Sequence, residues 1–167
     1  MILPVVAYGH PMLRKIAQNI EKDYPDLNEL IDNMFETMYS SNGVGLAAPQ
    51  VNRSIKLFLV DTTPYAEEFT EAVNFKKVII NPQIIKEAGK KWSFNEGCLS
   101  IPDIREDVIR KPEIHIQYYD TDFKFHDETY DGVIARVIQH EYDHLEGILF
   151  VDKISSLRKT LLKRKLT

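Results

Sequence analysis

The 167-residue sequence contains a single cysteine, Cys98, and no excess of positive charge. One cysteine excludes an internal disulfide framework, which fits a reducing compartment. The formal net charge is −4, so we expect no sequence-specific nucleic-acid partner. No apolar run approaches the roughly 20 residues that cross a bilayer, and the N-terminus lacks the features of a secretory signal. We therefore expect a cytoplasmic protein with no membrane partner.

The chain has enough apolar residues for a core, since 44% of it is hydrophobic. Its length falls within the usual range of one domain. We find no internal repeat, low-complexity tract or linker in the sequence. We therefore expect one domain over residues 1–167.

Three segments show helical features. Apolar residues recur every three or four positions over residues 27–39, which predicts an amphipathic helix. The same period appears after Asp131, a candidate N-cap, and ends before Gly147, a candidate for the residue after the C-cap. A short basic helix is expected over residues 154–166.

The middle of the chain is rich in β-branched and aromatic residues, and we expect it to form strands. The predicted strands cover residues 55–60, 78–80, 107–110, 113–119 and 124–130. The polar, acidic stretch over residues 62–77 is expected to be a surface excursion. This order of elements predicts an α+β fold, a single compact domain of mostly antiparallel strands around a central helix at residues 131–147.

The central helix carries the pattern His-Glu-x-x-His, from His140 to His144. Residues four apart share one helical face, so the two imidazoles can bind one metal ion while Glu141 stands beside the open coordination position. The alternative is an ordinary solvated, charged helix. The pattern therefore indicates, without proving, that this is a metal-binding helix.

Two histidines leave a tetrahedral metal site in need of a third protein ligand. Cys98 is the main candidate, because it follows a glycine and precedes Ile101-Pro102, a context that suits an irregular strand holding a thiolate. A buried structural thiol is the alternative reading. His10, His115 and His126 are competing ligands, and none has a spacing that selects it.

Three motifs together resemble the signatures of the peptide deformylase family. They are GVGLAAPQ at residues 43–50, EGCLS at 96–100 and QHEYDH at 139–144. Residues 9–14 and 145–150 are also similar to segments of that family, so the resemblance covers most of the chain. It implies a metal-dependent amide hydrolase that removes the formyl group from the N-terminal methionine of nascent polypeptides.

The resemblance implies a role for each matching residue. Cys98, His140 and His144 would bind one divalent metal, Glu141 would be the general acid and base, and Gln50 and the backbone N–H of Leu99 would bind the oxyanion. Iron(II) is the metal expected in the cell, and zinc, nickel or cobalt can replace it. The ligand set alone is a good zinc site, and the Irving–Williams order places zinc above iron(II).

Further residues are expected around this centre. By resemblance, the substrate would contact Val44, Gly45, Phe94, Arg105, Val133 and Val137. Asp143 lies between the two histidines and is expected to pair with Arg110, which would fix the helix against the strand that follows Cys98.

The expected partners are formylated nascent polypeptides and, through the basic C-terminal helix, the ribosome. Six basic residues lie between Lys153 and Lys165. Two alternatives for the function remain at this point. A zinc peptidase also uses His-Glu-x-x-His, but typically takes its third ligand downstream. A metal-stabilised binding domain would need the ligands and not Glu141.

Overall fold

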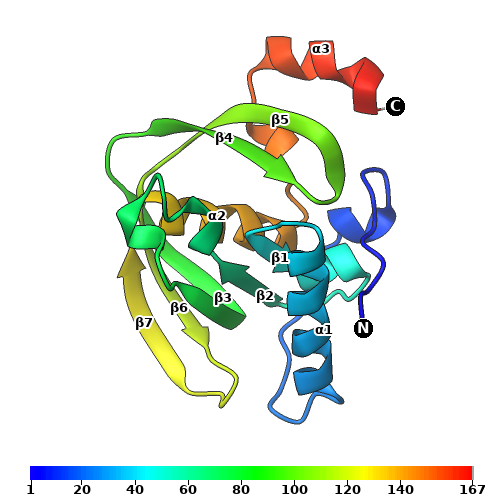
Figure 1. The fold of residues 1–167 in the computed structure, drawn as a ribbon, viewed down its shortest axis with the longest axis vertical. Helices are drawn as coiled ribbons and strands as arrows, with labels where there is room; N and C mark the ends of the chain where they lie inside the picture. The colour runs from blue at the N-terminus through cyan, green and yellow to red at the C-terminus, as the bar shows by residue number, and fades with distance from the viewer. Residues whose placement is uncertain (167) are drawn as a thin grey trace.

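The larger of two sheets in the computed structural model, which describes residues 1–166, has five antiparallel strands. The strand order is β1-β2-β3-β6-β7, and every neighbouring pair is antiparallel (Figure 1). The strands are β1 (Gly45–Ala47), β2 (Leu57–Asp61), β3 (Lys76–Ala88), β6 (Glu113–Tyr119) and β7 (Phe125–Tyr130).

Two further strands, β4 (Trp92–Cys98) and β5 (Ile101–Arg110), form a separate antiparallel hairpin. This hairpin arches over α2 (Gly132–Leu145), on the side away from the five-stranded sheet (Figure 1). The central helix is therefore enclosed between two β-structures that belong to different sheets.

The other helices are α1 (Leu27–Ser40) and α3 (Ser156–Leu166). Buried residues of α1 share one core cluster with β2, and buried residues of α2 share another with β2, β3 and β6. Helix α3 lies beyond the hairpin (Figure 1) and is anchored by the buried Leu162. No helix within residues 1–166 is long and apolar enough to span a membrane.

The α+β prediction, with mostly antiparallel strands around a central helix, is confirmed. Helix α1 extends one residue beyond the predicted range, and β6 coincides with residues 113–119. Gly147 follows the C-cap Glu146 with φ +74, and a Cβ there would lie 2.6 Å from the Arg14 carbonyl oxygen. Asp131, however, makes no side-chain capping bond, and the Val133 N–H instead points at a carboxylate oxygen of Glu71, 3.5 Å away.

The predicted surface excursion over residues 62–77 is wrong in part. Thr62 and Ala72 are fully buried, with the Thr62 hydroxyl donating to the Ala72 carbonyl at 2.8 Å. The rings of Tyr65 and Phe69 pack against Phe94 on the hairpin, at centroid distances of 5.7 and 5.9 Å. These aromatic residues turn the segment inward, although its acidic residues suggested a solvated loop.

Candidate metal centre and catalytic site

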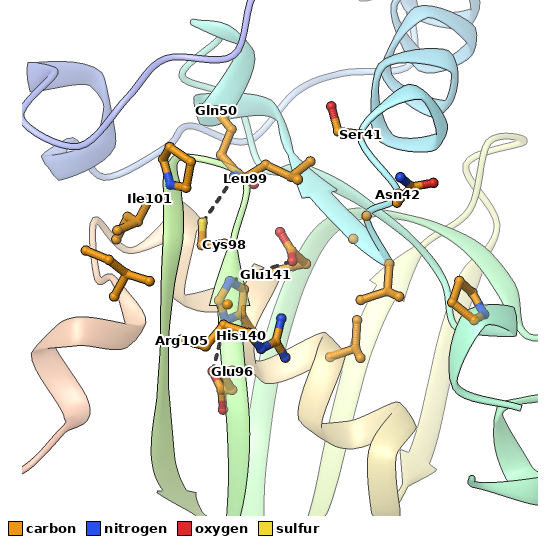
Figure 2. A pocket seen from close by; sticks show the side chains of 18 of the residues that line it. Ser41, Asn42, Gln50, Glu96, Cys98, Leu99, Ile101, Arg105, His140 and Glu141 are labelled. Atoms are coloured by element: carbon orange, nitrogen blue, oxygen red, sulfur yellow. Dashed lines mark hydrogen bonds and ion pairs between the residues drawn. The ribbon is translucent and has the colours of Figure 1, made fainter. Parts of the chain in front are cut away.

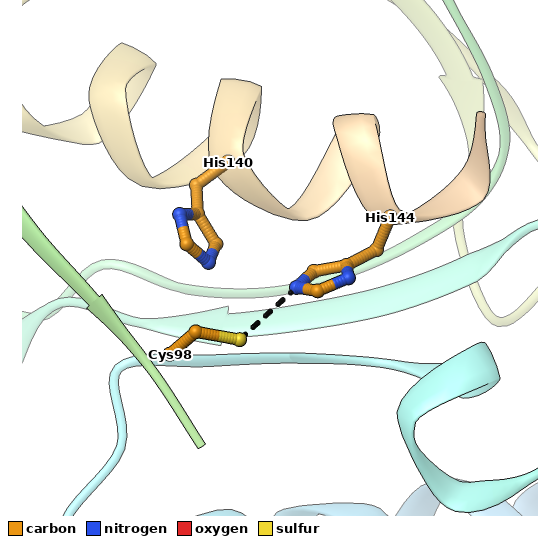
Figure 3. A group of neighbouring side chains, drawn as sticks. All are labelled: Cys98, His140 and His144. Carbon is orange, nitrogen blue, oxygen red and sulfur yellow. Dashed lines mark hydrogen bonds between the residues drawn. The ribbon is translucent and has the colours of Figure 1, made fainter. Parts of the chain in front are cut away.

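Three potential metal ligands from two separate elements meet in the structure. His140 and His144 project from successive turns of α2, and Cys98 lies opposite them at the end of β4 (Figure 3). One ligand atom from each lies within 4.8 Å of the others, and Cys98 Sγ is 3.3 Å from His144 Nε2. Among residues 1–166 this is the one such group of His, Cys, Asp and Glu side chains, and His10, His115 and His126 lie outside it.

The chemistry of this donor set fits a divalent metal. His140 uses Nδ1 in a hydrogen bond with Glu96 Oε1 at 2.9 Å, which leaves Nε2 for a metal. Burial lowers the pKa of His144 well below its ordinary value, which favours the neutral imidazole that binds a metal. One thiolate and two imidazoles are a ligand set typical of a catalytic site with an open fourth position.

Glu141 is buried beside the three ligands without being one of them. Its side chain is turned to the centre, with Oε2 4.0 Å from His140 Nε2 (Figure 2). The other oxygen, Oε1, is buried and has no hydrogen-bond partner among residues 1–166. Burial raises the pKa of Glu141 to about 7. A carboxyl group with such a pKa can both accept and return a proton near neutrality.

Gln50 reaches the same centre from the short 3-10 helix Ala48–Val51. Its Oε1 accepts a hydrogen bond from the Ala47 N–H at 2.9 Å, and its Nε2 donates to Ser100 Oγ at 3.1 Å and contacts Cys98 Sγ at 3.4 Å. The amide is therefore held with its N–H donors facing the cysteine (Figure 2). Leu99, which follows Cys98 in the hairpin turn, lines the adjoining cavity.

A cavity of about 640 Å³ opens beside these residues. Five of the six predicted substrate contacts line it: Val44, Gly45, Phe94, Arg105 and Val137. Pro64 and Tyr65, from the segment predicted to be a surface excursion, complete its wall. The site thus combines a metal-ligand group, a buried carboxylate and an apolar pocket.

The sequence matches the Polypeptide deformylase family model over residues 2–160. The chain belongs to this family. A peptide deformylase from Christiangramia forsetii is 58% identical over 173 residues, covering 99% of this chain and 88% of the relative, and the Flavobacterium johnsoniae protein matches with the same figures. The solved peptide deformylase of Thermotoga maritima superposes with a TM-score of 0.84 at 37% identity, covering 93% of this chain and 99% of that one.

One predicted pocket residue of this deformylase lies elsewhere. Val133 and Val137 belong to the same core cluster, but Val133 is fully buried and does not line the cavity, whereas Val137 does. Helical spacing places Val133 one turn before Val137, but the first turn of α2 faces the sheet. Arg136, which the sequence analysis did not select, lines the cavity instead.

The deformylase centre also contains a buried charge that the sequence analysis missed. Glu96 accepts hydrogen bonds from Arg110 Nε and Nη2, at 2.8 and 3.0 Å, and from Arg136 Nη1 at 2.7 Å, in addition to its bond with His140. Burial by itself raises the pKa of Glu96, but the hydrogen bonds from His140 and Arg110 outweigh it and hold the pKa well below its ordinary value. The signal available in the sequence was an acidic residue inside EGCLS, two positions before the cysteine.

The expected contact between Arg110 and Asp143 is present, with Arg110 Nη1 donating to Asp143 Oδ2 at 2.7 Å. Arg110 thus bonds to both Glu96 on the hairpin and Asp143 on α2. Asp143 Oδ2 also lies 3.9 Å from Lys153 Nζ. Glu96 and Arg110, the two buried ions of this group, are paired with each other, as low-dielectric surroundings require.

Proposed function

We propose that Cys98, His140 and His144 hold one divalent metal with which this deformylase hydrolyses the formyl amide of N-terminal formyl-methionine on nascent polypeptides. We also propose that residues 1–167 form one catalytic domain. The observation that carries the proposal is the convergence of the three ligand atoms beside Glu141, a buried carboxylate with an unpartnered oxygen. A divalent metal held there supplies Lewis acidity and lowers the pKa of water.

Glu141 moves the protons of the reaction. It accepts the proton of the attacking water and then returns it to the departing amine, so that formate leaves. Its pKa of about 7 suits both steps. Glu141 Oε1, which has no hydrogen-bond partner within the described part of the chain, remains available to the reacting groups.

Gln50 and the backbone N–H of Leu99 stabilise the charge that develops on the formyl oxygen. The hydrogen bonds of Gln50 to Ala47 and Ser100 orient its amide before substrate arrives. Such preorganised donors each contribute about 2.7–4 kcal/mol to transition-state stabilisation in other enzymes.

The methionine side chain enters the pocket between Val44, Phe94 and Val137, and Gly45 presents its backbone to the peptide. Arg105 is exposed and lines the cavity, and its guanidinium donates to the Asn95 side-chain and backbone oxygens at 2.8 Å. These bonds hold the arginine in one orientation beside the peptide.

Formate release from a formyl-methionyl peptide, with and without a chelator, tests this function. We expect chelator-sensitive release and no cleavage of an internally cleavable peptide. Internal cleavage would support the zinc peptidase instead. Metal binding and chelator-induced unfolding with neither activity would support the metal-stabilised binding domain.

We further propose that the metal in the cell is iron(II), with zinc, nickel or cobalt as substitutes. Zinc binds such donor sets more tightly than iron(II) by the Irving–Williams order, so occupancy and activity must be measured separately. We expect anaerobically iron-loaded protein to exceed the zinc form in turnover and to decay in air, with nickel or cobalt restoring durable activity. Added oxygen mass on the Cys98 peptide would identify one route of decay. Equal anaerobic turnover of all forms would contradict this choice of metal.

We also propose a cytoplasmic location and weak, salt-sensitive docking of α3 on the ribosome. The basic residues concerned are Arg158, Lys159, Lys163, Arg164 and Lys165, and Arg158 is already paired with Glu106 on the hairpin. Deleting residues 157–167 would also remove the buried Leu162, so reversal of Arg164 and Lys165 to glutamate is the cleaner test. Co-sedimentation with ribosomes should fall for this variant and not for Lys77→Glu on β3. Unchanged co-sedimentation after both the deletion and the reversal would contradict docking.

A further inference from the structure

One face of α2 is polar, largely buried and turned to the β4–β5 hairpin. The residues on it follow the spacing i, i+3, i+4, i+7 and are Arg136, Gln139, His140 and Asp143. The last three are bonded to the Lys111 carbonyl, the Glu96 carboxylate and the Arg110 guanidinium, respectively. The β4–β5 hairpin does not pair with the five-stranded sheet. Hydrogen bonds from these side chains therefore help to fix its position on α2.

Arg136 makes the most extensive of these connections. Its Nη1 donates to Glu96 Oε2 at 2.7 Å and to the Val108 carbonyl at 2.9 Å, and its Nη2 donates to the Trp92 carbonyl at 2.7 Å. Trp92 and Val108 belong to opposite strands of the hairpin. One planar guanidinium thus bonds to both strands and to the Glu96 carboxylate, a geometry that suits arginine and not lysine.

The position of the hairpin matters because the metal ligands are divided between the two elements. Cys98 lies on the hairpin, whereas His140 and His144 lie on α2. Glu96, which Arg136 holds, also orients the ring of His140. Outer hydrogen-bond partners of this kind fix the orientation of metal ligands.

We infer that Arg136 is a positioning residue, which fixes the hairpin against α2 at the separation where Cys98 meets the two histidines. This inference rests on the metal site of the proposed function. Arg136 is 1% exposed and is among the largest fully buried side chains of residues 1–166, so the hairpin cannot shift toward the helix without displacing it.

The same side chain supports the substrate pocket. Its guanidinium carbon lies 4.9 Å from the ring centroid of Trp92 and 5.6 Å from that of Phe94, within the range of cation–π contacts. Phe94 and Arg136 both line the cavity. Arg136 therefore joins the wall of the methionine pocket to the support of His140, and its replacement should affect KM as well as metal binding.

The test compares zinc affinity, by chelator competition, and the thiolate-to-cobalt(II) absorption band in wild type, R136M and R136K. We expect R136M to bind zinc about 10–100-fold more weakly, the usual effect of losing an outer partner of a metal ligand. The cobalt band should weaken, because Cys98 would be displaced relative to His140 and His144. R136K should fall between, since an ammonium can reach Glu96 but cannot span both strands.

R14M is the matched control, because Arg14 also has a bidentate carboxylate partner, Asp152, which lies outside the hairpin. It should keep wild-type zinc affinity and the wild-type cobalt spectrum. A purely structural role for Arg136 would lower thermal stability alone. Wild-type zinc affinity and cobalt spectrum in folded R136M and R136K would overturn the inference, and R136K decides if R136M does not fold. Wild-type protein that binds neither zinc nor cobalt would contradict the proposed metal site instead.

Discussion

Gly45→Ala should inactivate the enzyme while leaving the metal ligands in place, because Gly45 lies directly against Glu141. A Cβ at position 45 would lie 2.6 Å from Glu141 Oε2 and 2.8 Å from both Cδ and Cγ. Gly45 is paired with Val60 in the sheet, so the backbone of β1 cannot easily retreat. Glu141 must therefore move.

The expected size of the effect follows from that displacement. Relieving three contacts shorter than 3.0 Å moves the carboxylate by most of an ångström, and misplacing a catalytic group by about 1 Å can lower the rate by about 10²-fold. This corresponds to about 2.7 kcal/mol of transition-state stabilisation. Overpacking should also lower the free energy of unfolding by about 1–3 kcal/mol.

Formate release measured on metal-replete protein, together with metal content and thermal unfolding, checks the prediction. The loss should appear in kcat, with one metal ion per chain retained. Gly43→Ala is the comparison, because its Cβ would lie 3.1 Å from Leu99 Cδ1, 3.2 Å from Met38 Cγ and 3.5 Å from the Met38 carbonyl oxygen, with no contact shorter than 3.0 Å, and turnover should change much less. A folded Gly45→Ala protein with wild-type turnover would refute the proposed contact between Gly45 and the catalytic carboxylate.

Three further predictions concern the same centre. Glu141→Ala should keep the metal and the fold but lose about 10²–10⁴-fold in kcat, and near wild-type formate release would refute its role as base. Alanine at Cys98, His140 or His144 should instead abolish stoichiometric metal binding, measured by metal analysis after dialysis, and a variant that keeps its metal would remove that residue from the ligand set. Gln50→Ala should lower kcat by about 10²–10³-fold with unchanged metal content, whereas a change confined to KM would assign the amide to substrate binding.

Local patterns in the sequence were enough to predict several features of the fold. The three- and four-residue period of α1 survives in the structure because burial of one helical face is a local property of the chain. The pairing of His140 with His144 follows in the same way from four-residue spacing on α2. Helical geometry alone places these two rings side by side.

Resemblance to a family supplied what spacing could not. As the third ligand, Cys98 competed in the sequence with His10, His115 and His126. No local pattern links Cys98 to His144, which lies 46 positions later in the chain. The motif around the cysteine selected it, and the structure brings its sulfur to 3.3 Å from His144 Nε2.

Packing between residues distant in the chain decided which side chains line the pocket and which hold the site together. Val133 and Val137 share a helical face, but only the tertiary structure places the first in the core and the second on the cavity. The residues around Tyr65 appear solvated by composition, yet aromatic packing against Phe94 turns them into part of the pocket wall. Arg136 looks like an ordinary helical arginine in the sequence. Its role depends on the packing of the β4–β5 hairpin against α2. The acceptors for its buried guanidinium are Glu96, Val108 and Trp92, which are distant in the chain.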